Sequence, residues 1–214
     1  MTLNQVKVVR PESCGWLEKN LSIQEMDYLW RCVDNRKESI KNTLAGNIHE
    51  SNKIIDENDW FWKNTLNPLT HVYANEFGNL GENIPVNQFH SYFLQSFWVN
   101  YQKQGEFNPP HNHNGVYSFV IWMKIPTRHF EQNRLSFALN SNTHKVSSFE
   151  FHYEDIIGEQ RYFTYEMNPE IEGTMLFFPS RLMHQVFPFY NCGEDRISIS
   201  GNISLNTKEV MKKV

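Results

Sequence analysis

Residues 105–126 read GEFNPPHNHNGVYSFVIWMKIP, and this stretch decides the fold class. Its second half is almost entirely apolar, aromatic or β-branched and lies between a glycine and a proline, which is typical of a buried strand. Similar short runs fill the rest of the chain after Pro85, with no helical segment of useful length between them. Antiparallel pairing in a sandwich or barrel is therefore predicted, in preference to a parallel sheet with crossover helices. The predicted strands lie within residues 89–102, 115–126, 147–153, 161–168, 173–180, 184–189 and 196–205.

The N-terminal part of the chain has a mainly helical pattern. Ser22 is followed three residues later by Glu25, which is the spacing of a capping box, so a helix is expected to begin there. A second helix is expected to end just before Pro68. We therefore expect a mainly helical layer over residues 1–82 that packs on a β-domain over residues 83–210, most simply as one folding unit.

Composition argues against several classes of partner. With 20 basic and 24 acidic residues the net charge is -4, so no overall positive field recruits nucleic acid or an anionic membrane. Three widely spaced cysteines without a C-x-x-C pair favour neither a disulfide framework nor a thiolate metal site, and they suit a reducing compartment. No apolar run is long enough for a membrane span, so a soluble, cytoplasmic protein is expected.

Three of the nine histidines have the spacing of metal ligands. In an extended strand, residues two apart point to the same face, about 6.5 to 7 Å apart. His111 and His113 can therefore approach one ion from one side, and His184, at the edge of a later strand, is the candidate third ligand. An isolated H-x-H is more often a pair of loop histidines, so the surrounding residues decide.

The residues around these histidines match two motifs. Gly105 precedes His111 by six residues, and Gly173, Pro179 and His184 keep the order glycine, five residues, proline, four residues, histidine. Both patterns resemble the two cupin motifs, and this resemblance implies a mainly β (α+β) fold: a double-stranded β-helix, or jelly roll, with an N-terminal helical layer. The glutamate that closes the first cupin motif has no counterpart here.

A candidate anion site follows the third histidine. Twelve residues after His184, alternation in DRISISGN places Arg196, Ser198 and Ser200 on one face of a strand. The planar guanidinium of arginine matches a carboxylate with two parallel hydrogen bonds, and a hydroxyl two residues on can donate to the same group.

The chain resembles the 2-oxoglutarate- and iron(II)-dependent oxygenases, in particular the prolyl-hydroxylase-like proteins of bacteriophages and bacteria. The resemblance implies that His111 and His184 hold Fe(II), and that Arg196, helped by Ser198, binds the distal carboxylate of 2-oxoglutarate. It rests on residues 108–126, 172–189 and 195–203.

The sequence departs from the usual H-x-D pattern of this family at His113, where the carboxylate ligand would stand. Three-histidine iron sites exist among cupin dioxygenases, so His113 can be the third ligand. Glu106 or Asp155 could instead supply a carboxylate. A second register, with His113 and Gly115 as an H-x-G pattern similar to that of radical halogenases, leaves His111 without a role.

Four further residues are candidates on the strands around the metal loop: Asn100 and Tyr117 for binding 2-oxoglutarate, and Trp122 and Asn202 for the second shell or the substrate. The predicted function is an oxygenase that hydroxylates a prolyl or other residue of a protein or peptide, or a small molecule. The alternatives are a three-histidine cupin dioxygenase that uses no 2-oxoglutarate and a non-catalytic metal-binding cupin protein. The oligomeric state stays open, with a homodimer among the options.

Overall fold

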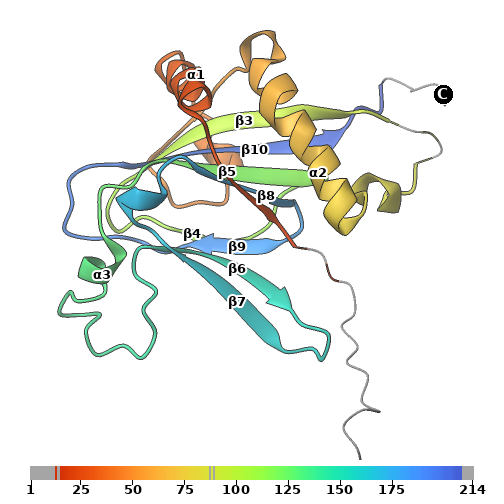
Figure 1. Ribbon diagram of the computed structural model, residues 1–214. Coiled ribbons are helices and arrows are strands. Elements are labelled where there is room, and N and C mark those ends of the chain that lie inside the picture. The colour runs from red at the N-terminus through yellow and green to blue at the C-terminus, as the bar shows by residue number, and fades with distance from the viewer. Residues whose placement is uncertain (1–12, 14, 87, 89, 209–214) are drawn as a thin grey trace, which may run out of the picture.

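Two antiparallel sheets face each other in the computed structural model, which describes residues 13, 15–86, 88 and 90–208. The larger sheet has the strand order β1-β8-β5-β10-β3-β2 and the smaller sheet the order β4-β9-β6-β7. Figure 1 shows the smaller sheet below the larger one, as in a jelly roll. The strands are β1 (Leu17–Asn20), β2 (Glu50–Lys53), β3 (Tyr92–Gln102), β4 (Asn108–His111), β5 (Tyr117–Lys124), β6 (Ser148–Glu154), β7 (Gln160–Glu166), β8 (Thr174–Pro179), β9 (Met183–Val186) and β10 (Arg196–Leu205).

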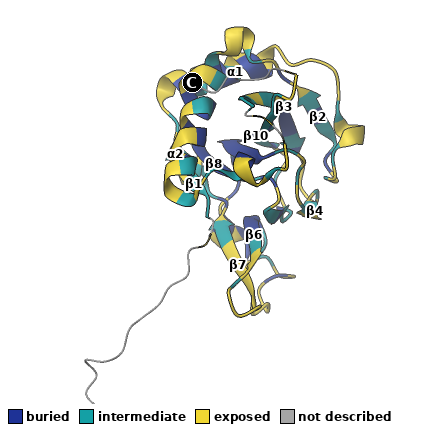
Figure 2. Ribbon diagram, turned by 90° about the vertical axis from the view of Figure 1, so that its right-hand side faces the viewer, coloured by how far each residue is buried: buried dark blue, intermediate teal, exposed yellow. Residues whose placement is uncertain are grey.

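Two helices, α1 (Ile23–Asp34) and α2 (Asn67–Phe77), cover the outer face of the larger sheet (Figures 1 and 2). One apolar core fills the space between these helices and the sheet, and a second core fills the space between the two sheets. No helix in the described part of the chain is long and apolar enough to cross a membrane. The shorter helical elements are η2 (Lys41–Thr43), η3 (Glu57–Asp59), η4 (Trp62–Leu66), η5 (Leu80–Asn83), α3 (His129–Gln132) and η6 (Pro169–Ile171).

The first helix begins where the sequence predicts it. The backbone N–H of Glu25 donates to the Ser22 hydroxyl at 3.3 Å, and the backbone N–H of Ser22 donates to the Glu25 carboxylate at 2.8 Å. The prediction for Pro68 is wrong, because this proline lies in the first turn of α2 and does not follow its end. A first-turn position suits proline, since its missing N–H would have no partner inside the helix.

All seven predicted strands are confirmed, as β3 and β5 to β10, whereas β1, β2 and β4 were missed. Each missed strand is only four residues long, and β4 contains two prolines. The described part of residues 1–82 is therefore less purely helical than expected, because β1 pairs with β8 and β2 pairs with β3 at the two edges of the larger sheet. We propose on this ground that residues 1–82 and 83–210 fold as one unit.

The segment of residues 39–48 runs beside the start of β4. Its first part is held to β2, where the backbone N–H of Ile40 donates to Ser51 at 2.8 Å. Its last part forms a bridge with Phe107, in which Asn47 donates at 2.9 Å and accepts at 3.3 Å. Gly46 lies against the side chain of Asn108 so closely that a Cβ atom at position 46 would overlap the Asn108 amide oxygen.

Substitution of Gly46 by alanine tests this close approach. We expect Gly46→Ala to lower the free energy of unfolding by about 1–3 kcal/mol, because the added methyl group must displace the Asn108 amide or the 39–48 segment. Chemical denaturation followed by circular dichroism measures the change. Gly193→Ala is the matched control, since a Cβ there meets no atom within 4 Å. If the two variants are equally stable, the 39–48 segment moves aside without lowering the free energy of unfolding.

Candidate active site

Three histidine side chains converge at one end of the space between the sheets. His111, the last residue of β4, lies directly opposite His184 in the antiparallel pair that β4 forms with β9. His113 follows in the next loop, where its backbone N–H donates to the carbonyl of Ser180 at 2.8 Å. The candidate ligand atoms of the three imidazoles all lie within 4.8 Å of one another, and the Nε2 atoms of His113 and His184 are 3.1 Å apart.

Backbone carbonyl groups orient two of the rings. His111 Nδ1 is 2.7 Å from the carbonyl oxygen of Pro109, and His184 Nδ1 is 2.9 Å from that of Leu182. Because a carbonyl only accepts, each Nδ1 must carry the proton, and the Nε2 lone pair is left to point into the cluster. Such outer contacts commonly fix the rings of metal-binding histidines.

Burial keeps the three imidazoles neutral. It lowers the pKa of His111, lowers the pKa of His113 to about 4 and lowers that of His184 well below its usual value. Neighbouring imidazoles add to the effect at His113 and His184. Neutral imidazole is the form that binds a divalent ion, so the donor set fits Fe(II), although it equally fits zinc, nickel or cobalt.

The two carboxylates considered as alternative ligands lie elsewhere. Glu106 accepts from the backbone N–H groups of Lys103 and His49, at 2.8 and 3.0 Å. Asp155 lies in the turn between β6 and β7, where Arg161 donates to it at 2.7 Å. Neither belongs to the histidine cluster, so the suggestion that one of them completes it is wrong.

A polar cavity of about 250 Å³ adjoins the three histidines. One wall is a ladder of cross-strand pairs between β10 and β3, in which Ser200 faces Trp98 and Ser198 faces Asn100. On the same face of these strands, the next pair along is Arg196 and Gln102, which are also buried but do not line the cavity. None of the described residues that line the cavity is an aspartate, glutamate, lysine or arginine.

Arg196 is buried, and no described residue serves as its counter-ion. Its side chain is 2% exposed, Nη2 donates to the Ser147 hydroxyl at 2.7 Å, and Nη1 makes longer contacts with Phe187 O and Gln102 Oε1, at 3.3 and 3.4 Å. The guanidinium also lies 4.7 Å above the ring of Phe189. Within the described part of the chain no carboxylate pairs with it and Nε has no partner, and burial lowers the pKa of Arg196 to about 9.

Of the four further candidates, two line the cavity. Asn100 accepts a hydrogen bond from Ser51 at 2.7 Å, and Asn202 accepts one from Ser118 at 2.8 Å. The prediction for Tyr117 is wrong, because its side chain faces the helices and packs in the core beneath them. Trp122 is on the inner face of β5 but packs in the core between the sheets and does not line the cavity.

The cavity wall also contains residues that are not among the candidates predicted from the sequence. The Trp98 ring lies 5.9 Å from the His113 ring, and its buried Nε1 has no partner among the described residues. Alternation along β3 could have revealed Trp98, since it lies two residues before Asn100. Asn108 and residues 43–46 also line the cavity, but no local sequence signal places them there.

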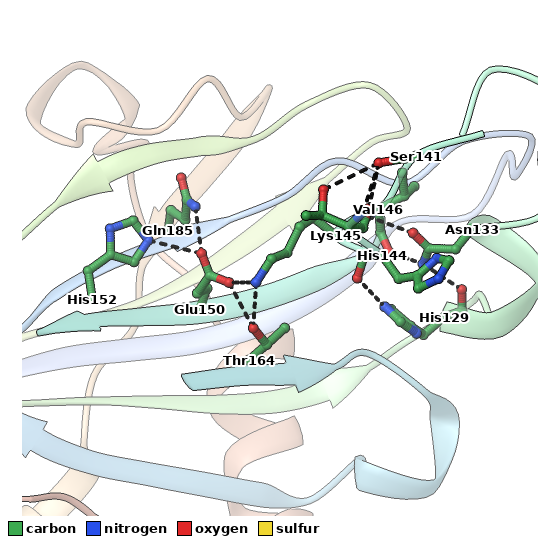
Figure 3. A network of polar contacts seen from close by, with 11 residues as sticks. His129, Asn133, Ser141, His144, Lys145, Val146, Glu150, His152, Thr164 and Gln185 are labelled. Atoms are coloured by element: carbon green, nitrogen blue, oxygen red, sulfur yellow. Dashed lines mark hydrogen bonds and ion pairs between the residues drawn. The ribbon is translucent and has the colours of Figure 1, made fainter. Parts of the chain in front are cut away.

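A buried polar network lies on the outer face of the smaller sheet, which contains the strand that carries His184 (Figure 3). The Glu150 carboxylate on β6 accepts from Thr164 at 2.7 Å and from Gln185 at 3.1 Å, and it is paired with Lys145. Burial opposes ionisation of Glu150, but these hydrogen bonds and the lysine charge lower its pKa overall. Because Gln185 follows His184 directly, this network ties the strand that carries His184 to β6 and β7.

Comparisons with known proteins agree with this arrangement. Residues 96–202, half of the chain, match a protein-family model described as "Putative 2OG-Fe(II) oxygenase". A prolyl-4-hydroxylase of Pseudomonas putida has a similar fold, with a TM-score of 0.52 and 14% identity over 88% of this chain and 92% of that one. A 2OG-Fe(II) oxygenase-family oxidoreductase of Burkholderia pseudomallei has a TM-score of 0.50 and 12% identity over 86% and 80% of the two chains. A search of curated proteins finds no match.

The similar structures establish the fold, and the family model establishes the family. A double-stranded β-helix, a cluster of neutral imidazoles and a buried arginine without a counter-ion among the described residues are all consistent with that family's cofactors. The chain belongs to the 2-oxoglutarate- and Fe(II)-dependent oxygenases, and it is an oxidoreductase with these two cofactors.

Proposed function

We propose that His111, His113 and His184 hold the iron through their Nε2 atoms. The observation that carries this proposal is the convergence of three neutral imidazoles, whose candidate ligand atoms lie within 4.8 Å of one another and two of which are oriented by backbone carbonyl groups. His113 occupies the position where the family usually has a carboxylate, so the protein adds no negative charge to the ion here. The bound keto acid would then supply the negative charge at the metal, because the described residues of the site supply none.

Arg196 and Ser198 would bind the distal carboxylate of 2-oxoglutarate. A buried, ionised guanidinium without a carboxylate partner is costly, and an incoming carboxylate would supply the missing partner. Ser198 lies on the same strand face, one pair nearer to the cavity. A buried arginine in this position favours the keto-acid oxygenase over a three-histidine dioxygenase without a keto acid, because only the first needs a carboxylate anchor.

The substrate that we propose is an uncharged residue of a protein or peptide. The iron and keto acid supply the oxidising chemistry, while the chain's own residues bind and orient the substrate. A charged group in this cavity would lose its hydration and meet no opposite charge among the described lining residues. Asparagine and serine side chains instead offer hydrogen bonds that match peptide groups. Proline is the first residue to test, because its side chain is uncharged and one protein of similar fold is a prolyl-4-hydroxylase.

Metal binding tests the ligand set. The visible spectrum of Co(II) added to the protein should report a site of nitrogen donors, and His113→Ala should weaken Co(II) binding by at least about tenfold, because one ligand is lost. His113→Asp should keep the metal, since a carboxylate is also a ligand. The control is His71→Ala, which removes an exposed histidine on α2. Unchanged affinity in His113→Ala would exclude His113 as a ligand.

Binding of the keto acid tests the anchor. Anaerobic addition of Fe(II) and then 2-oxoglutarate should produce the weak visible charge-transfer band of the chelated keto acid. Arg196→Ala should raise the 2-oxoglutarate concentration needed for half of the band by on the order of tenfold or more. Arg161→Ala, which removes a half-exposed arginine of β7, should not change it. A band that develops equally in all three proteins would reject Arg196 as the anchor.

Peptide oxidation tests the substrate class. Peptides that differ only in a central proline, leucine, asparagine, lysine or glutamate can be incubated with the enzyme, and mass spectrometry then measures oxygen addition at that residue. We expect the uncharged residues to react on the order of tenfold faster or more, because the cavity offers a charged group no partner. Preferential oxidation of lysine or glutamate would contradict the proposal.

A further inference from the structure

Ser147, directly before β6, has a backbone conformation that is unusual for a serine. Its φ angle is +57°, in the left-handed region that favours glycine, and the residue is completely buried. A non-glycine residue persists in this region only when the surrounding structure fixes it, and such residues are concentrated at functional sites. Contacts with neighbouring segments must therefore stabilise this conformation, and we expect the conformation to have a function.

Hydrogen bonds on both sides of Ser147 are the cause. The side-chain amide of Asn133 binds both backbone groups of Val146, at 3.1 and 2.9 Å, as Figure 3 shows. Ser147 itself donates to the carbonyl of Pro188 at 2.8 Å and accepts from the N–H of Met167 at 3.1 Å. These bonds join the chain to three separate segments and leave the backbone at position 147 little freedom.

The consequence is the direction of the hydroxyl group. Ser147 Oγ accepts from Arg196 Nη2 at 2.7 Å and lies 3.2 Å from Thr127 Oγ1. Because the oxygen accepts from the guanidinium, its own proton is free to be donated to Thr127. Ser147 thus reaches from the smaller sheet to β10 of the larger sheet and makes the shortest polar contact of the buried arginine.

We propose that Ser147 is a positioning residue for the carboxylate anchor of 2-oxoglutarate, and that it acts through Arg196. By holding Nη2, the hydroxyl fixes the plane of the guanidinium and leaves Nε, which has no partner in the described part of the chain, as a free donor for the ligand. A fixed donor loses less freedom when the carboxylate binds, so affinity increases. The inference rests on the proposed role of Arg196 as the anchor.

Two substitutions distinguish the effect of the hydroxyl group from that of the backbone conformation. Ser147→Ala removes the hydroxyl and keeps the unfavourable conformation, whereas Ser147→Gly removes the hydroxyl and relieves it. Each variant is loaded anaerobically with Fe(II), and its affinity for 2-oxoglutarate is measured by titration calorimetry beside its melting temperature. Ser148→Ala is the matched control, since it removes the neighbouring buried hydroxyl, which has no hydrogen-bond partner among the described residues.

We expect both Ser147 variants to bind 2-oxoglutarate about tenfold more weakly, the equivalent of one lost hydrogen bond to a charged group. Ser147→Gly should nevertheless melt at a higher temperature than Ser147→Ala. Binding of 2-oxobutyrate, a keto acid without the distal carboxylate, should be the same in all variants, which shows that the metal end is intact. Ser148→Ala should bind both keto acids as the native protein does.

Two outcomes would overturn the inference while leaving the proposed anchor intact. If affinity follows melting temperature, so that Ser147→Gly binds 2-oxoglutarate normally, the role of Ser147 is only structural. If binding of 2-oxobutyrate falls equally, Ser147 supports the metal site and not the anchor. If Arg196→Ala also binds 2-oxoglutarate normally, the proposed anchor is wrong, and the inference fails with it.

Discussion

The antiparallel pairing of β4 with β9 is the constraint on which the site depends, because it places His111 directly opposite His184. Cross-strand partners have their Cβ atoms only about 4.5 to 5.5 Å apart, so two imidazoles on one face must meet. The loop after β4 then needs only to turn back over the pair for His113 to join them. Phe149 and Phe178 pack against the His184 ring and exclude water from its inner side.

The opposite wall of the cavity leads to a second positive charge that needs an anionic partner. β10 and β3 carry a ladder of polar side chains that ends in Arg196, a buried cation without a counter-ion among the described residues. None of the described residues neutralises this charge or would neutralise that of a metal ion on three neutral imidazoles. A dicarboxylate keto acid can compensate both, one with each end. The two cofactors are therefore expected to stabilise each other's binding, because each reduces the uncompensated charge that the other meets.

Much of this arrangement could be predicted from short patterns. Strand positions follow from alternation and from aromatic or β-branched runs, and His184 and Arg196 are the first residues of two of those runs. The H-x-H pair lies between two runs and is revealed by its own spacing. Local patterns do not show which face of a strand meets the cavity, so Tyr117 was assigned to the wrong side of β5. The wall formed by residues 43–46 depends on a bridge between Asn47 and Phe107, and Ser147 meets Arg196 across two sheets. Contacts between segments so far apart leave no periodic signal in the sequence.

The 39–48 segment also affects how the substrate specificity of this enzyme can evolve. Both ends of the segment are held by backbone hydrogen bonds, to Ser51 and Phe107, while Thr43, Leu44 and Ala45 line the cavity between them. Since those bonds do not use side chains, Leu44 and Ala45 can be exchanged without removing any of them, whereas the Thr43 hydroxyl also donates to the carbonyl of Ile40 at 2.7 Å. Selection, or a directed library, can thus reshape one wall of the cavity while the metal ligands and the carboxylate anchor stay in place, with Gly46 as the fixed point next to Asn108.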